Sequence, residues 1–188
     1  MTEPVRVGML GCGVVGTGVA RLLIEHAGPI SDRAGVPVLL RRIAVRNLSK
    51  KRDPRVDPTL LVGNAAEVVA DPQVDVVVEV MGGIEPARTL ILQALALGKP
   101  VVTANKELLA TSGRDLLDAA EAAGVDLKFE ASVAGAIPVI HAIKESLAGD
   151  RLRRILGIVN GTTNYVLWRM ATTGAAYGEA LAEATELG

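Results

Sequence analysis

The feature that most restricts the fold of this chain is an alternation of short runs rich in Val and Ile with longer runs rich in Ala and Leu. Strands that are buried on both faces read as continuous apolar runs, and helices that connect them make the strands parallel. The pattern therefore predicts an α/β fold, a doubly wound parallel sheet, over residues 1–132. The predicted strands are 5–10, 38–46, 75–81, 100–104 and 125–130, and the predicted helices are 14–27, 86–97, 106–111 and 114–123.

The stretches outside these elements divide into two surface loops and a second module. Residues 28–37, "GPISDRAGVP", and 46–58, "RNLSKKRDPRVDP", are rich in turn-forming and charged residues, so both are predicted to be exposed loops. After Glu130 the sequence changes to a turn-rich entry, a helix, a strand and a second helix. We expect residues 133–188 to begin a separate α+β domain.

Composition narrows the partners and the compartment that we expect. With 20 Lys and Arg against 21 Asp and Glu, the formal net charge is −1, so no excess positive charge attracts nucleic acid or an anionic membrane. The aromatic residues Phe129, Tyr165, Trp168 and Tyr177 offer few surfaces on which bases could stack. The single cysteine, Cys12, cannot form an internal disulfide, and the N-terminus lacks a signal sequence, so we expect a cytoplasmic protein.

Three glycines follow the first predicted strand in the pattern G-x-G-x-x-G, namely Gly11, Gly13 and Gly16. The segment runs directly into a predicted helix, which is the context of a dinucleotide-binding turn. In such a turn the first glycine permits the tight bend, the second lets the backbone approach a pyrophosphate, and the third allows close helix packing. The alternative is a turn that binds nothing, because glycine also serves tight turns for conformational reasons alone. The context favours a Rossmann-like nucleotide domain.

The residue that contacts the cofactor's ribose is expected at the end of the second strand. Asp32 lies at about the sequence distance of the usual acid, but it precedes that strand. The strand itself ends at Arg46, and Lys50 and Lys51 follow and add to the positive field. Because an arginine can receive a 2′-phosphate, this arrangement favours NADP over NAD. The alternative is an ordinary solvated basic loop, which would leave the cofactor preference open.

A lysine stands where a helix does not favour one. Lys106 follows a predicted strand and Asn105, a good N-cap, so it falls in the first turn of a helix, where a cation opposes the helix dipole. This turn lies at the carboxyl edge of the sheet, where doubly wound folds bind ligands. Lys106 is therefore a candidate proton donor or electrostatic stabiliser of a substrate oxygen. The competing interpretation is an exposed lysine at the end of a loop.

Four other residues carry weaker signals. Glu79 interrupts an apolar strand, and either a structural hydrogen bond or a cofactor contact would satisfy its carboxyl group. Cys12 is expected to fill a small space in the glycine turn and not to act as a nucleophile. His26 and His141 are expected to have neither a nearby acid nor a metal-ligand companion at the spacing that zinc requires, so both are expected to be structural.

Six segments resemble the homoserine dehydrogenase family in order and spacing: "GCGVVGTGV", "AVRNLSKKR", "VVVEVMGG", "PVVTANKELLA", "FEASVAGAIPVI" and "GIVNGTTNYVLWRM". The resemblance covers essentially the whole chain. It implies an oxidoreductase that interconverts L-homoserine and L-aspartate 4-semialdehyde with NAD(P), in the biosynthesis of threonine and methionine. It also implies that residues 133–188 begin a substrate-binding and dimerisation domain, and that the full-length protein is a homodimer.

The same resemblance implies roles for individual residues. The cofactor loop is Gly11, Gly13, Val14, Val15 and Gly16, Arg46 contacts the 2′-phosphate, and Lys106 lies between the nicotinamide and the reacting carbon. A monovalent cation, typically sodium, binds at Glu130, Val133, Gly135 and Ile137, mostly through carbonyl oxygens. Asn160, Gly161, Thr162 and Thr163 help to form the substrate pocket.

The family continues past the position of Gly188 into a segment with acidic substrate ligands and a second lysine that has the main acid/base role. We therefore expect low or no turnover of homoserine by these 188 residues alone. The alternative function is a dinucleotide-binding module that holds cofactor without catalysis. A related semialdehyde dehydrogenase with a thiol nucleophile is disfavoured, because the sequence has no cysteine besides Cys12.

Overall fold

The structure is a computed structural model that describes residues 3–135, 137–158 and 160–187. Its internal contacts separate the chain into two compact units, Met1–Ser132 and Val133–Gly188.

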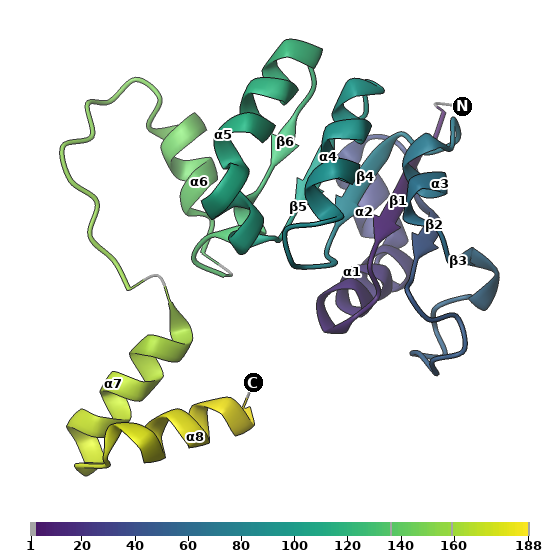
Figure 1. Ribbon diagram of the computed structural model, residues 1–188. Coiled ribbons are helices and arrows are strands. Elements are labelled where there is room, and N and C mark those ends of the chain that lie inside the picture. The colour runs from purple at the N-terminus through teal and green to yellow at the C-terminus, as the bar shows by residue number, and fades with distance from the viewer. Residues whose placement is uncertain (1–2, 136, 159, 188) are drawn as a thin grey trace. The chain divides into compact units, whose positions relative to one another are not determined.

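The first unit contains a six-stranded parallel sheet with the order β3-β2-β1-β4-β5-β6 (Figure 1). The predicted Rossmann-like sheet is therefore confirmed. Strand order reverses at β1, which lies between β2 and β4, and this is the place where open α/β sheets bind ligands. The strands are β1 Val5–Leu10, β2 Val38–Ala44, β3 Leu61–Val62, β4 Val76–Glu79, β5 Val101–Thr103 and β6 Leu127–Lys128.

Helices pack on both faces of this sheet and create two apolar cores (Figure 1). On one face α1 (Val14–Glu25) packs against β1 and β2, with α2 (Ala27–Ala34) beside it. On the other face α3 (Ala65–Ala70), α4 (Ala87–Ala96) and α5 (Lys106–Ala123) lie in sequence order next to one another. The buried apolar runs of the sequence therefore pack against helices on both faces of the sheet.

Strand β1 shows how the sequence supplies both cores. Successive strand residues point to opposite faces, so Val7 and Met9 join the core under α1, whereas Leu10 joins the core under α3, α4 and α5. Gly8 also faces α3, and a Cβ there would lie 2.7 Å from Cγ1 of Val68. Helix α3 consequently lies closer to β1 than any side chain at position 8 would allow.

The surface loop predicted at 28–37 is wrong, because most of it belongs to α2. Pro29 lies in the first turn of α2, where a backbone N–H has no acceptor within the helix, so a proline costs little. The helix ends at Gly35, which takes a left-handed φ of 73°. No residue of α2 is buried, and its first turn contains Gly28 and Pro29, which are typical of turns, so its sequence resembles an exposed loop.

The break predicted between two helices at 112–113 is also wrong, since α5 runs unbroken from Lys106 to Ala123. Glycine in a helix costs about 1 kcal/mol relative to alanine, which made Gly113 a plausible end. The buried side chains of Leu108, Leu116 and Ala120 lie on one side of α5 and join the core, and this packing outweighs the cost. Asn105 is the N-cap, as predicted, and accepts a hydrogen bond from the Leu108 N–H at 3.1 Å.

Two short elements have no counterpart in the predictions. Strand β3 has two residues and α3 has six, and both fall below the length at which periodicity is readable. Strand β1 has the predicted bounds. Strands β2, β4, β5 and β6 are shorter than predicted, most clearly β6, where two residues pair of the six expected.

The loop between β2 and the short helical turn η1 (Pro58–Leu60) is fastened to α1 by one arginine. Arg55 donates from Nη1 to Oε1 of Glu25 at 2.6 Å, and from Nε and Nη2 to the carboxylate of Asp53 at 2.7 and 2.5 Å. Val56, the next residue, is buried in the core under α1. The predicted exposed loop at 46–58 is therefore exposed along most of its length but held at its far end.

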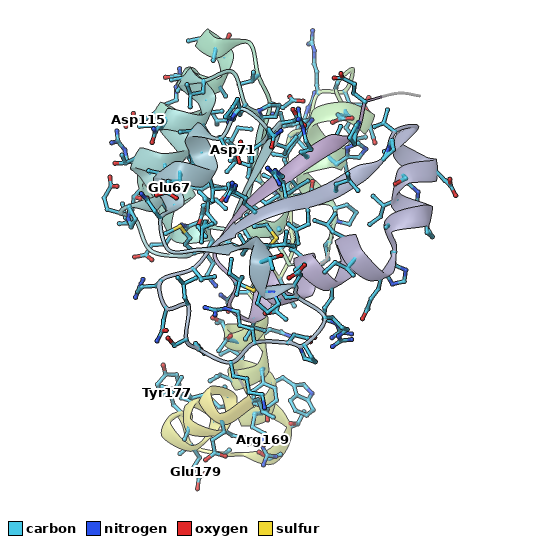
Figure 2. All side chains as sticks on the ribbon, turned by 90° about the vertical axis from the view of Figure 1, so that its right-hand side faces the viewer. Glu67, Asp71, Asp115, Arg169, Tyr177 and Glu179 are labelled. Atoms are coloured by element: carbon cyan, nitrogen blue, oxygen red, sulfur yellow. The ribbon has the colours of Figure 1, made fainter. Side chains whose placement is uncertain are left out.

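The second unit is helical in the part that the structure describes. It contains α6 (Val139–His141), which continues into the turn η3 (Ala142–Ser146), and a hairpin of α7 (Gly161–Thr173) and α8 (Tyr177–Leu187). Figure 2 shows Arg169, Tyr177 and Glu179 on this hairpin, and Arg169 Nε donates to Glu183 Oε2 at 2.7 Å.

The strand predicted between the two helices of this second unit is not found in residues 147–158, and residue 159 lies outside the described part. A strand needs a partner to receive its backbone hydrogen bonds, and the described residues of this unit contain no other strand. Among the described residues, no helix has the length and apolar character needed to cross a bilayer.

Two neighbouring leucines test the orientation of α5. Leu116 is fully buried, whereas Leu117 is 36% exposed. Leu116→Ala should lower the free energy of unfolding by about 3 kcal/mol, because it leaves a cavity against the sheet, and Leu117→Ala should lower it by about 1 kcal/mol or less. Urea denaturation followed by circular dichroism measures both values. Equal losses for the two variants would contradict this packing of α5.

The Arg55 contacts predict a pH-dependent contribution to stability. The hydrogen bonds from Arg55 lower the pKa of Asp53 from 3.8 to about 2 and also lower the pKa of Glu25. A carboxyl group whose pKa falls on folding stabilises the folded state above its unfolded pKa and loses that effect as pH drops toward its folded pKa. Arg55→Met should therefore be less stable than the wild type at pH 5, and the difference should shrink between pH 4 and pH 2. Denaturation curves at stepped pH measure it, and a constant difference would refute the linkage.

Candidate cofactor site

The glycine turn brings three backbone segments into direct contact. Gly11 has a φ of 105°, and a Cβ there would lie 2.8 Å from the carbonyl oxygen of Val80. A Cβ on Gly16 would overlap the carbonyl oxygen of Gly11 and lie 3.2 Å from Cγ2 of Val80. Both positions therefore exclude side chains, and α1 begins against the end of β1 and the loop that follows β4.

Gly13 is different, because nothing surrounds the place where its side chain would be. No atom lies within 4 Å of a Cβ at this position. Gly13 is the N-cap of α1, and no side chain of the described residues caps the first turn. Val14 and Val15 are 94% and 55% exposed. Unsatisfied N–H groups at an open helix N-terminus suit a phosphate, so these residues fit the pyrophosphate of a dinucleotide.

The residues predicted to meet the ribose lie just beyond β2. Arg46, Lys50 and Lys51 are all exposed. Arg52 shapes this loop, because its guanidinium donates to the carbonyl oxygens of Lys50 and Asn47 at 2.9 and 2.7 Å. Asp32 lies on α2 and not at the strand end. Residues 45–52, which immediately follow β2, thus contain four cations, Arg46, Lys50, Lys51 and Arg52, and no carboxylate.

On the other side of β1, the carboxyl ends of β4 and β5 are joined by hydrogen bonds. Glu79 is fully buried and accepts from the Met81 N–H at 2.8 Å and from the Thr103 hydroxyl at 2.6 Å. Asn105 donates from its side chain to the Gly83 carbonyl oxygen at 2.7 Å. Of the two interpretations of Glu79, the structural hydrogen bond is the one that these contacts support.

Lys106 is exposed in the first turn of α5, at this same edge of the sheet. Within the described part of the chain, no carboxylate lies within 4 Å of its ammonium group. The positive charge is therefore not neutralised locally. Because the first turn of a helix disfavours a cation, Lys106 is not explained by the stability of α5.

The remaining candidates near the first unit have ordinary structural surroundings. Cys12 is half-buried beside the core under α1, with its Sγ 3.7 Å from Oγ1 of Thr17. His26 lies at the junction of α1 and α2. In the second unit, Nδ1 of His141 lies 3.3 Å from Oε1 of Glu145, so the expectation that this histidine has no nearby acid is wrong: the two residues are four positions apart on one helical stretch and therefore on the same side of it.

The residues predicted to bind substrate and cation are distributed over both units. Asn160 caps α7 by accepting from the Thr163 N–H at 2.8 Å, and Gly161, Thr162 and Thr163 form its exposed first turn. Glu130 belongs to the first unit, in the turn η2 (Glu130–Ser132), whereas Val133, Gly135 and Ile137 belong to the second. The described residues contain no cluster of three or more His, Cys, Asp or Glu side chains that could hold a metal. That finding does not test a site made mostly of carbonyl oxygens.

Two residues that hold this region together, Arg52 and Thr103, were not identified from the sequence. The hydrogen bonds of Arg52 depend on the direction of the loop carbonyl groups, and in the sequence Arg52 is only one more charge of a basic loop. The link between Glu79 and Thr103 joins residues 24 positions apart. The one sequence signal for this link was the carboxylate of Glu79 in an apolar strand. A buried carboxylate needs hydrogen-bond partners, but the sequence does not show which residues they are.

Sequence profiles of one family match nearly the whole chain. The profile described as "Homoserine dehydrogenase, NAD binding domain" matches residues 11–130, and the profile described as "Homoserine dehydrogenase" matches residues 138–188.

Individual relatives agree with this match. The chain is 52% identical over 184 residues to the homoserine dehydrogenase of Corynebacterium glutamicum and 53% identical over 186 residues to that of Mycobacterium tuberculosis. These alignments cover 98% and 99% of this chain but 41% and 42% of the two relatives. The chain thus spans about two fifths of the length of the curated relatives it matches.

Solved structures extend the likeness to three dimensions. A homoserine dehydrogenase from Thiobacillus denitrificans matches with a TM-score of 0.92 and 47% identity, over 99% of this chain and 43% of that one. A hyperthermophilic archaeal homoserine dehydrogenase in complex with NADPH matches with a TM-score of 0.81 and 25% identity, over 99% of this chain and 62% of the other. The chain that carries this glycine turn and this lysine therefore belongs to the homoserine dehydrogenase family.

Proposed function

We propose that this chain forms the nucleotide-binding part of a homoserine dehydrogenase, an oxidoreductase that interconverts L-homoserine and L-aspartate 4-semialdehyde in threonine and methionine biosynthesis. The observation that carries the proposal is the open N-terminus of α1 at the point where strand order reverses. Gly11, Gly13, Val14, Val15 and Gly16 would hold the pyrophosphate there through backbone N–H groups and close approach.

The cofactor that we propose is NADP, with NAD as the second choice. Arg46, followed by Lys50, would face the 2′-phosphate beyond the end of β2. In a Rossmann fold the adenosine half lies over the strands on one side of the reversal and the nicotinamide half over the strands on the other. The nicotinamide would then lie near the ends of β4 and β5.

For Lys106 we propose a part in the chemistry. When bound, the nicotinamide accepts or donates the hydride, and the residues of the chain position the reactants and stabilise charge. The exposed ammonium group of Lys106 lies at the nicotinamide side of the sheet edge. It would donate a hydrogen bond to the substrate oxygen that gains negative charge as its proton leaves.

The substrate and cation contacts remain part of the same proposal. The first turn of α7, Asn160, Gly161, Thr162 and Thr163, would supply amide and hydroxyl groups to the amino acid. A monovalent cation, sodium by preference, would be held by Glu130, Val133, Gly135 and Ile137. Ala134 and Gly135 both have a positive φ, 55° and 60°, so the backbone turns sharply in this segment, as a cradle of carbonyl oxygens requires.

Since the chain corresponds to two fifths of its relatives, we propose cofactor binding for these residues and turnover for the complete protein, a cytoplasmic homodimer. The competing function is a dinucleotide-binding module without catalysis. Oxidation of homoserine by the complete protein with NADP distinguishes the two, because a binding module gives no reduced nicotinamide.

Titration with NADPH and with NADH, followed by nicotinamide fluorescence, tests the cofactor proposal. Arg46→Ala should raise the Kd of NADPH about tenfold, because it removes a charged hydrogen bond to phosphate, and should change the Kd of NADH by about twofold or less. Arg33→Ala, which removes an exposed charge from α2, is the matched control and should change neither. Equal weakening of NADPH and NADH would place Arg46 away from the 2′-phosphate, and no binding of either by the wild type would refute the cradle.

Steady-state kinetics of the complete protein test Lys106. Lys106→Met should lower kcat for homoserine by about 100-fold and leave the Kd of NADPH within about threefold, because the ammonium group acts in proton transfer and charge stabilisation. Arg114→Met, on the exposed surface of the same helix, removes an equal charge and should retain the wild-type kcat. An unchanged kcat for the Lys106 variant would refute the proposed role, and Lys106 would then be an ordinary surface residue.

A further inference from the structure

Glu79 makes an unusual set of contacts for a residue of a sheet. It is fully buried, and three groups donate hydrogen bonds to its carboxylate oxygens. Oε1 accepts from the N–H groups of Met81 and Gly82, at 2.8 and 3.3 Å, and Oε2 accepts from the Thr103 hydroxyl at 2.6 Å. One carboxylate thus joins the loop after β4 to the end of β5.

These contacts belong to a closed ring of hydrogen bonds. Thr103 Oγ1 accepts from the Asn105 N–H at 3.0 Å, and the Asn105 amide donates to the Gly83 carbonyl oxygen at 2.7 Å. The amide oxygen of Asn105 accepts from the Leu108 N–H and so starts α5. The ring therefore connects the loop Val80–Gly83 to the helix turn that carries Lys106.

Two partners of Glu79, Met81 and Gly82, lie in the loop after β4, and the third, Thr103, is the buried last residue of β5. Gly82 and Gly83 both have left-handed φ values, 74° and 73°, so this loop has no regular secondary structure to hold it. It packs against the glycine turn, as the 2.8 Å approach of Val80 to the side-chain position of Gly11 demonstrates. A buried carboxylate costs desolvation energy that an apolar side chain would avoid, so core packing alone does not account for a glutamate here.

We propose that Glu79 is a positioning residue for the nicotinamide half of the site. It holds the loop Val80–Gly83 and the first turn of α5 in one arrangement, and it acts through them without touching cofactor or substrate. This inference rests on the proposed cofactor site, because the ends of β4 and β5 face the nicotinamide in that orientation. The adenosine half depends on other contacts, those of Arg52 and Arg55.

Because the two halves have separate supports, two ligands distinguish positioning from general stability. NADPH reports on both halves, whereas adenosine 2′,5′-bisphosphate reports on the adenosine half alone. In Glu79→Gln an amide replaces one oxygen, so at least one of the three donors loses its acceptor. The variant should raise the Kd of NADPH about tenfold and that of adenosine 2′,5′-bisphosphate by about twofold or less.

Further variants approach the same ring from its other side. Thr103→Val removes the hydroxyl and should give the same selective loss, and Thr103→Ser restores it and should recover the wild-type ratio of the two Kd values. Glu121→Gln, which removes one charge from the exposed end of α5, is the matched control. Isothermal titration measures each Kd, and circular dichroism verifies that each variant is folded.

The outcomes separate this inference from the proposed function. Selective weakening of NADPH in both Glu79→Gln and Thr103→Val supports positioning. Equal weakening of both ligands, or no weakening of NADPH, overturns it and leaves the cofactor site intact, since the wild type still binds. If the wild type binds neither ligand, the proposed function fails and the positioning role fails with it.

Discussion

The arrangement of the first unit depends on backbone surfaces that meet where no side chain fits. Gly8 admits α3, Gly11 admits the loop after β4, and Gly16 admits the turn that ends β1. Larger residues at the last two positions would meet backbone atoms, which cannot rotate away as side chains can. The N-terminus of α1 is consequently fixed at the reversal of strand order. The free N–H groups of the first turn point toward the helix N-terminus, and no atom lies within 4 Å of a Cβ at Gly13, so this end of the helix suits a phosphate.

The two sides of this turn are held by different kinds of contact. Beyond β2, the exposed Arg55 forms ion pairs and the half-buried Arg52 binds the loop's own carbonyl oxygens, and ion pairs of exposed groups are weak and sensitive to salt. Beyond β4, the fully buried Glu79 joins the following loop to the end of β5, and its hydrogen bond with Thr103 is shielded from water and salt. In the proposed orientation the loop after β2 would select the cofactor, and such a loop can tolerate adjustment of its shape. The ends of β4 and β5 would face the transferred hydride, and that role requires atoms held to within a fraction of an ångström.

Local patterns predicted most of the sheet because the signals for β1, the glycine turn and α1 all lie within about twenty residues of each other. The same local reasoning failed where tertiary packing decides. Gly113 resembles a helix end, but Leu116 and Ala120 continue the buried side of Leu108, so α5 continues through it. Residues 28–37 resemble a loop, because Gly28, Pro29 and Gly35 are typical of turns and no residue of α2 is buried. The sequence of β3 is too short to be distinguished from the loop around it.

The sequence predicted which residues lie at the candidate site, but not the contacts that hold them there. Parallel strands bring their carboxyl ends to one edge, so residues that follow strands, such as Arg46 and Lys106, can be placed there from topology alone. What holds those residues is not readable in this way, because Glu79 and Thr103 are partners only when β4 and β5 pair in register. The register is fixed in the core under α3, α4 and α5, where Val77 and Val101 lie opposite one another and are fully buried. The apolar packing of the sheet therefore fixes the positions of β4 and β5, and the hydrogen bonds at the sheet edge fix the loops relative to these strands.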